Sequence, residues 1–146
     1  MKYTGVQALA NPLAGLLVAH LEHLRYAAAW SDAFDAVIPI PLHRRRLLAR
    51  GYQQAALLAA PVAQHFGWPL REDILFRRRA TRPQVGLPQR IRQNNVRGAF
   101  VVRGAAPRRV LLVDDVVTTA STMRACAKAL RDAGSGEVVA VALAHG

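Results

Sequence analysis

Two adjacent aspartates, Asp114 and Asp115, and the hydroxyl-rich residues after them are the part of this sequence best suited to chemistry. A carboxylate buried next to an apolar segment is costly unless it meets hydrogen-bond donors or a cation. The pair therefore indicates a place where a polar ligand or a hydrated metal ion binds. Residues 118–122 carry small side chains and precede a predicted helix, whose first backbone N–H groups attract phosphate. The carboxylates can accept hydrogen bonds from sugar hydroxyls, and the helix start beside them can bind a phosphate. Together they favour a phosphorylated sugar as the ligand.

A simpler interpretation of the same residues is a strand that ends in solvent and is followed by a helix cap. The neighbouring residues favour the binding site. Residues 109–113 form an apolar, partly β-branched run after the first arginine, which is typical of a strand buried on both faces of a parallel sheet. Residues 123–132 are predicted as a helix. We therefore expect a buried strand, a ligand-binding turn and a helix in this order.

Residues 113–122 resemble the phosphoribosyl pyrophosphate (PRPP) motif of type I phosphoribosyltransferases. The resemblance implies that Asp114 and Asp115 are the catalytic pair, which holds the ribose 2′ and 3′ hydroxyls and binds Mg²⁺ through water. It implies that the 5′-phosphate is bound by Thr118, Thr119, Ala120, Ser121 and Thr122. Ala120 stands where the family usually has glycine. Either the backbone keeps a negative φ there, or an alanine occupies a left-handed conformation at a modest cost.

A second segment with binding potential lies between a predicted strand at 35–41 and a predicted helix at about 55–66. It is rich in arginine, and arginines between a strand and a helix can clamp a diphosphate through paired hydrogen bonds. The segment resembles the ComF/GntX group of phosphoribosyltransferase-like proteins, associated with competence for DNA uptake, in the pattern Pro39-x-Pro41-Leu42, Arg46, Arg50-Gly51-Tyr52-x-Gln54. The resemblance implies that Arg46 and Arg50 bind the pyrophosphate of PRPP. Arg44 and Arg45 fit a solvated charge run equally well.

Residues 77–97 contain seven arginines and no acidic residue, and their weak periodicity predicts a long mobile loop. In type I phosphoribosyltransferases a loop at this place closes over the reaction centre and excludes water. The loop resembles that of ComF in the patterns Arg79-x-Thr81-x-x-Gln84, Arg92-x-x-Asn95 and Gly98-Ala99-Phe100. The resemblance implies that this is the flexible loop of the site, with the site residues Arg79, Gln84, Arg92 and Asn95.

The positive charge of the chain is concentrated in its middle. The net charge is +11, but residues 36–113 hold fifteen arginines and two acidic residues, whereas the rest holds five basic and seven acidic residues. A section with this much positive charge either faces an anionic partner or is exposed to solvent. An arm that binds single-stranded DNA is therefore an alternative to the catalytic loop, although aromatic residues that could stack on bases make up only 6% of the chain.

Strands and helices alternate along the remaining chain, with a helix predicted from Asn11-Pro12 onward, short strands at 70–76 and 100–102 and a last strand at 138–143. This alternation predicts an α/β fold with a parallel sheet, flanking helices and the ligand at the carboxyl ends of the strands, as in the type I phosphoribosyltransferases. A length of 146 residues with 52% hydrophobic residues predicts a single domain over 1–146.

Several classes of protein are disfavoured. The only cysteine, Cys126, is expected to pack inside a helix, so neither a disulfide framework nor a four-cysteine zinc site is expected. The cysteine-rich, zinc-binding N-terminal segment of many ComF-like proteins is not expected here. No apolar run is long enough for a membrane span and no signal-like segment follows Met1, so we expect a cytoplasmic protein.

The leading hypothesis is a ComF-like glycosyltransferase that uses PRPP and Mg²⁺, transfers phosphoribosyl to a nitrogen acceptor and releases pyrophosphate, with a role in competence. The alternative is a non-catalytic module of the DNA-uptake machinery that keeps a pocket for PRPP or ribose 5-phosphate and binds single-stranded DNA or DNA-uptake proteins. The resembled superfamily also suggests a homodimer.

Overall fold

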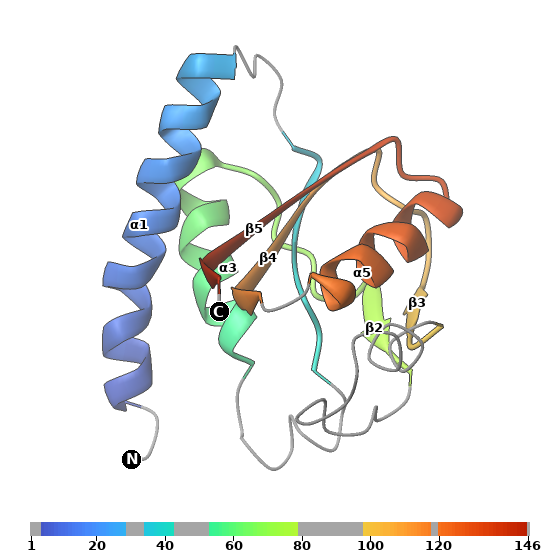
Figure 1. Cartoon of the computed structure of the whole chain (residues 1–146), viewed down its shortest axis with the longest axis horizontal. Helices are drawn as coiled ribbons and strands as arrows, with labels where there is room; N and C mark the ends of the chain where they lie inside the picture. Colours follow the sequence, from blue (N-terminus) through green and yellow to red (C-terminus); the bar gives the residue numbers. More distant parts are fainter. Residues whose placement is uncertain (1–3, 29–33, 43–52, 79–97, 118–119, 146) are drawn as a thin grey trace.

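A parallel sheet of three strands forms the centre of the fold (Figure 1). The computed structural model describes residues 4–28, 34–42, 53–78, 98–117 and 120–145. In the sheet, β4 (Arg109–Val117) lies between β1 (Ala36–Pro39) and β5 (Glu137–His145), parallel to both. The middle of β4 is fully buried because helices cover both faces of the sheet, which explains its unbroken apolar run.

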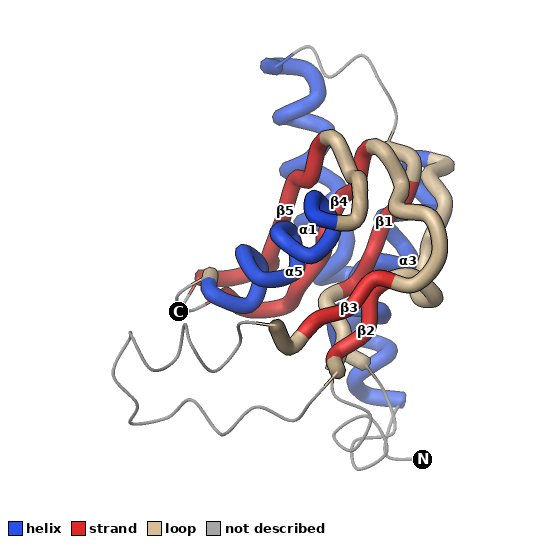
Figure 2. The backbone as a smooth tube through the Cα atoms, turned by 90° about the vertical axis from the view of Figure 1, so that its right-hand side faces the viewer, coloured by secondary structure: helices blue, strands red, loops and turns tan. Residues whose placement is uncertain are grey.

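Helices α1 (Thr4–Ala28) and α3 (Gln54–Phe66) cover one face of the sheet, and α5 (Ser121–Asp132) covers the other (Figures 1 and 2). Alternate strand residues divide between the two faces, as the period of two in a strand requires. The first core contains Val37, Leu111 and Val113 with side chains of α1 and α3. The second contains Ile38, Val110 and Leu112 with Met123, Cys126 and Leu130 of α5.

Two further strands form a separate antiparallel ribbon beside the parallel sheet. Strand β2 (Leu75–Arg77) pairs with β3 (Phe100–Val102), and the ribbon packs into the same core as α5. The predicted strand at 70–76 was wrong in its bounds. Leu70 makes only an isolated bridge to Val37, and Arg71 and Asp73 form an exposed ion pair at 2.8 Å.

Helix α1 begins at Thr4, so the predicted start at Asn11-Pro12 was wrong, and Pro12 lies inside the helix. A proline inside a helix removes one N–H donor and displaces the carbonyl four residues earlier. Here Pro12 and Ala8 are both exposed, so water can hydrate that carbonyl. The opposite side of the helix is buried at Ala14, Leu17 and Leu21, and this packing outweighs the local cost of the proline.

The other predicted elements are confirmed with small changes in their bounds, namely β1, α3, β3, α5 and β5. Cys126 is fully buried in α5, as expected from its position. Among the described helices, none combines the length and apolarity needed to cross a membrane.

Candidate functional site

Asp114 and Asp115 lie inside β4, where this central strand extends beyond its neighbour β1. The pairing of β1 with β4 ends at Pro39 and Val113, and the Ile40 N–H then donates to the Val113 carbonyl at 2.9 Å. On the other side, β5 continues along β4 as far as Val117. The sequence predicted the aspartates at the very end of the strand. Instead, both aspartates are part of β4, at positions where β1 no longer pairs with this strand.

The two aspartates belong to opposite faces of the sheet. Val113 packs into the core of α1 and α3, so strand alternation directs Asp114 toward α5 and Asp115 toward α3. The backbone holds both carboxylates: the Asp115 N–H donates to Asp114 Oδ1 at 2.9 Å, and the Val116 N–H donates to Asp115 Oδ1 at 2.8 Å. A ligand at this edge of β4 therefore meets two carboxylates that are already oriented.

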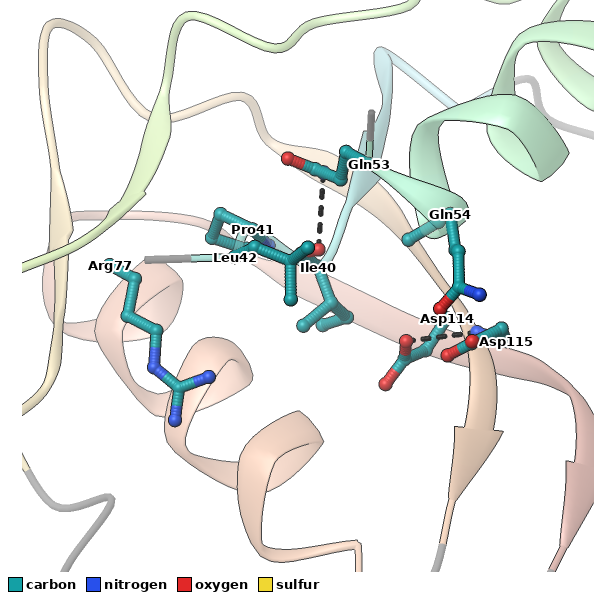
Figure 3. Close-up of a pocket in the computed structure, with 9 residues that line it drawn as sticks. Ile40, Pro41, Leu42, Gln53, Gln54, Arg77, Asp114 and Asp115 are labelled. Carbon is teal, nitrogen blue, oxygen red and sulfur yellow. Dashed lines mark hydrogen bonds between the residues drawn. The ribbon is translucent and has the colours of Figure 1, made fainter. Parts of the chain in front are cut away.

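A pocket of about 170 Å³ opens beside these carboxylates, between the end of β1 and the start of α3 (Figure 3). A hydrogen bond connects the two segments on either side of the pocket: the Gln53 Nε2 donates to the Ile40 carbonyl at 3.1 Å. Gln54 lies next to the aspartates, and Arg77 enters from β2 on the far side of the pocket. The described lining residues are Ile40, Pro41, Leu42, Gln53, Gln54, Ala55, Arg77, Asp114 and Asp115.

Burial raises the pKa of the Asp114 carboxyl from its usual value to about 7, and the hydrogen bond and negative charge of Asp115 contribute to the rise. The Asp115 N–H and the positive charge of Arg77 oppose it. A ligand that brings a cation or several hydroxyl donors would favour the charged form of Asp114. In the described part of the chain, no three His, Cys, Asp or Glu side chains converge as a ready-made metal site.

The backbone conformation of Ala120, for which the sequence allowed two possibilities, is left-handed in the structure. Ala120 has φ 59° and ψ 8°, so of the two possibilities the alanine does occupy a left-handed conformation, at a cost of about 1–2 kcal/mol. It is the N-cap of α5, and its carbonyl accepts from the Arg124 N–H at 2.9 Å. Ser121 is buried and Thr122 is half-buried at the first turn, where helix N–H groups have no acceptor within the helix.

The remaining predicted site residues lie outside the described residues: Thr118, Thr119, Arg46, Arg50, Arg79, Gln84, Arg92 and Asn95. Sequence reasoning gave no site role to Gln53, Gln54 or Arg77, although Gln54 belongs to the pattern shared with ComF. Arg77 was counted only as one arginine of a loop. Its place in the pocket depends on the pairing of β2 with β3, which no local pattern in the sequence reveals.

Comparison with known proteins shows the family and the fold of this chain. Residues 53–146 match the phosphoribosyl transferase domain family. The chain is 40% identical over 115 residues to competence protein F of Haemophilus influenzae, covering 76% of this chain and 50% of that protein. It is 32% identical over 139 residues to the DNA utilization protein YhgH of Escherichia coli O157:H7, covering 94% and 61%. The chain thus spans between half and two thirds of the length of these relatives.

Among solved structures, the glutamine phosphoribosylpyrophosphate amidotransferase from B. subtilis superposes with a TM-score of 0.55 at 19% identity. The match covers 97% of this chain and 26% of that one, and it concerns the fold alone. It confirms the predicted α/β fold of the type I phosphoribosyltransferases. The chain therefore belongs to the phosphoribosyl transferase domain family, and its sequence is similar to that of competence protein F.

Proposed function

We propose that the pocket beside Asp114 and Asp115 binds PRPP and that the chain transfers its phosphoribosyl group to a nitrogen acceptor. The observation that carries this proposal is the position of two oriented, half-buried carboxylates at the open edge of β4, next to a pocket and just before the start of α5. Sugar hydroxyls can donate to the carboxylates. The first turn of α5 offers N–H donors and a positive helix end to the 5′-phosphate.

In the proposed reaction the bond from C1 of the ribose to the pyrophosphate oxygen breaks, and a bond from C1 to the acceptor nitrogen forms. Pyrophosphate leaves with the bonding electron pair, and the nitrogen loses its proton to solvent. Positive charge develops near C1, and Asp114 and Asp115 would stabilise it electrostatically. Arg46 and Arg50 are the residues that we expect to neutralise the leaving group. Competence and DNA utilization, named for the two relatives, are the proposed biological setting.

The donor set fits magnesium. Two carboxylates offer only oxygen ligands, and Mg²⁺ usually binds through one or two carboxylates, substrate phosphates and retained waters. Asp114 and Asp115 would hold the ion through water. When bound, the ion supplies positive charge to the diphosphate and so assists its departure.

Isothermal calorimetry with PRPP, with and without Mg²⁺ and beside ribose 5-phosphate, tests the proposal. We expect PRPP to bind more tightly than ribose 5-phosphate and to need Mg²⁺, because the diphosphate is the group that requires the ion. Equal binding of the two ligands would show that the diphosphate half of the site is unused. Absence of binding would refute the proposal, whereas Mg²⁺-dependent binding would justify a screen of nitrogen acceptors.

A second candidate function, binding of single-stranded DNA, is favoured by the outer face of the β2–β3 ribbon. Phe76 lies opposite Val101 on this face, and the Arg103 Cζ lies 4.5 Å from the centroid of the Phe76 ring. Arg78 and Arg103 are both exposed. Aromatic rings and exposed arginines are the side chains that nucleic-acid surfaces combine for stacking and phosphate contact.

Removing two of these charges should weaken DNA binding in a salt-dependent way. We expect the variant Arg78→Gln with Arg103→Gln to bind an oligonucleotide less tightly at low salt. Two lost phosphate contacts should also reduce the slope of log K against log salt by about 1.4. Fluorescence anisotropy over a salt series measures both quantities. Arg131→Gln, an exposed arginine at the end of α5, is the control, and no DNA binding by the unmodified protein at low salt would eliminate this candidate.

A further inference from the structure

The outer edge of β5 pairs with no other strand of the described residues. β5 borders β4 on one side only, and Figure 2 shows it at the margin of the parallel sheet. Its nine residues include no proline, glycine or lysine, and every side chain between Glu137 and His145 is apolar. Proteins usually protect such an edge with a charge, a proline, a bulge or a covering segment. An edge this long and apolar is suited to pairing with another strand.

The contact of β5 with β4 determines which backbone groups of β5 face outward. The Glu137 N–H donates to the Arg108 carbonyl at 2.9 Å, so the backbone of Glu137 faces β4. Backbone groups alternate in direction along a strand, so the odd-numbered residues of β5 bond to β4 and the even-numbered residues direct N–H and C=O outward. The outward-facing residues are Val138, Ala140, Ala142 and Ala144.

Helix α1 extends this edge with exposed leucines. On its face of the sheet, α3 packs mainly over β1 and β4, whereas α1 packs over β5. Glu22 marks the flank of α1 that faces α3, because its Oε1 lies 3.0 Å from the His65 Nε2. Leu9 and Leu16 lie roughly 120–140° around the helix from Glu22, on the other flank, and are 62% and 61% exposed. The side of α1 turned away from α3 is the side of the free β5 edge.

We propose that this edge pairs with β5 of a second copy of the chain, antiparallel and centred on Val141, so that the sheet continues across a twofold axis. In this register Val138 pairs with Ala144 of the second copy, and Ala140 pairs with Ala142. All four are outward-facing residues, so each pair can exchange two N–H···O bonds. The twofold axis also brings the leucine flanks of both α1 helices to the same face of the joined sheet.

The side chains of β5 favour a second copy as the partner. Glu137 and His145 lie at opposite ends of the strand and on the same face, so antiparallel pairing sets a carboxylate opposite an imidazole at both ends. One Glu137 oxygen accepts from the Arg109 Nε at 2.7 Å, and the other can accept from the imidazole. Between these ends, apolar side chains meet apolar side chains. A second copy therefore matches the edge in backbone register, apolarity and charge.

Disulfide cross-linking of the full chain tests the register. Val141→Cys places two thiols beside the axis, where the Cα atoms of a non-hydrogen-bonded pair lie about 4.5 Å apart, within the reach of a disulfide. We expect mild oxidation to give a dimer on a non-reducing gel. Ala144→Cys is the matched control, because its thiol is more exposed but lies about 20 Å from its counterpart in the dimer. Equal cross-linking of the two variants, or none by Val141→Cys, would refute the register. Cys126 is buried and common to both.

Analytical ultracentrifugation over a concentration series tests the edge itself. We expect a mass of about twice 15.9 kDa at high concentration. Ala140→Pro removes one outward N–H from each copy and none that bonds to β4, so it should weaken association by about tenfold or more. Ala140→Thr keeps the N–H and suits a strand, so it should associate like the unmodified protein.

The outcomes decide the proposal in each case. A dimer that Ala140→Pro leaves unchanged would place the interface elsewhere and refute it. A monomer at every concentration would also refute it and leave the edge to a different partner. Circular dichroism verifies that Ala140→Pro is folded. If this variant unfolds, the cysteine variants decide: cross-linking of Val141→Cys but not of Ala144→Cys supports the proposal, and any other pattern refutes it.

Discussion

The double variant Asp114→Asn with Asp115→Asn is expected to lose PRPP binding, with a loss in affinity of at least about a hundredfold. Asparagine keeps the size of each side chain but removes the negative charge and replaces a hydrogen-bond acceptor by a donor. The ribose hydroxyls would then lose their charged acceptors, and a hydrated Mg²⁺ would lose both carboxylates. Calorimetry with PRPP and Mg²⁺ measures the effect.

The fold should survive this double substitution. Burial already disfavours the charged form of Asp114, so a neutral side chain at this position relieves a cost. Circular dichroism and thermal unfolding verify that the variant is folded. The matched control is Asp132→Asn at the opposite end of α5, an exposed carboxylate that pairs with Lys128 at 2.6 Å. Unchanged PRPP affinity in the folded double variant would remove Asp114 and Asp115 from the proposed site.

The fold could be predicted where local pattern and burial agree. The apolar run of β4, the helix after it and β5 each carry a periodicity that matches the final packing, so the unit from β4 to β5 followed from the sequence. Pro12 misled the prediction because a local rule for helix starts ignores the packing of Leu17 and Leu21 on the sheet. The antiparallel pairing of β2 and β3 joins residues that lie more than twenty positions apart, and no local period encodes it.

The candidate site was predictable in its chemistry more than in its geometry. The adjacent aspartates after a buried strand indicated a bound ligand. The sequence could not show that β4 extends beyond β1, so that the aspartates lie where β4 has no neighbour on the β1 side. Nor could it decide the conformation of Ala120, because alanine alone predicts a negative φ. The place of Arg77 in the pocket could not be predicted either. It is one of several neighbouring arginines in the sequence, and only tertiary contacts such as that with Phe100 set its position apart.

The free energy of unfolding of the unliganded protein is expected to contain a component that decreases as pH rises from about 4 to 7, because of Asp114. Its pKa is about 7 in the folded chain and about 3.9 in an unfolded one. Between these values the folded state keeps a proton that the unfolded state has lost, so raising the pH favours unfolding. The slope of this component approaches about 1.4 kcal/mol per pH unit in the middle of the range, is about half of that at pH 7 and nearly vanishes by about pH 8.

Urea unfolding of the unmodified protein and of Asp114→Asn, at pH 5, 6, 7 and 8, isolates this component. The other titratable groups are the same in both proteins, so the difference between the two stabilities reports Asp114. The variant should gain stability relative to the unmodified protein as pH rises, with the gain levelling off at about pH 8. Asp132→Asn, which changes an exposed carboxylate outside the pocket, is the control. A difference that is flat or falls with pH would mean that Asp114 is already charged in the empty pocket. The pocket would then hold a formed anionic site before any ligand arrives, and ligand binding would not need to displace a proton.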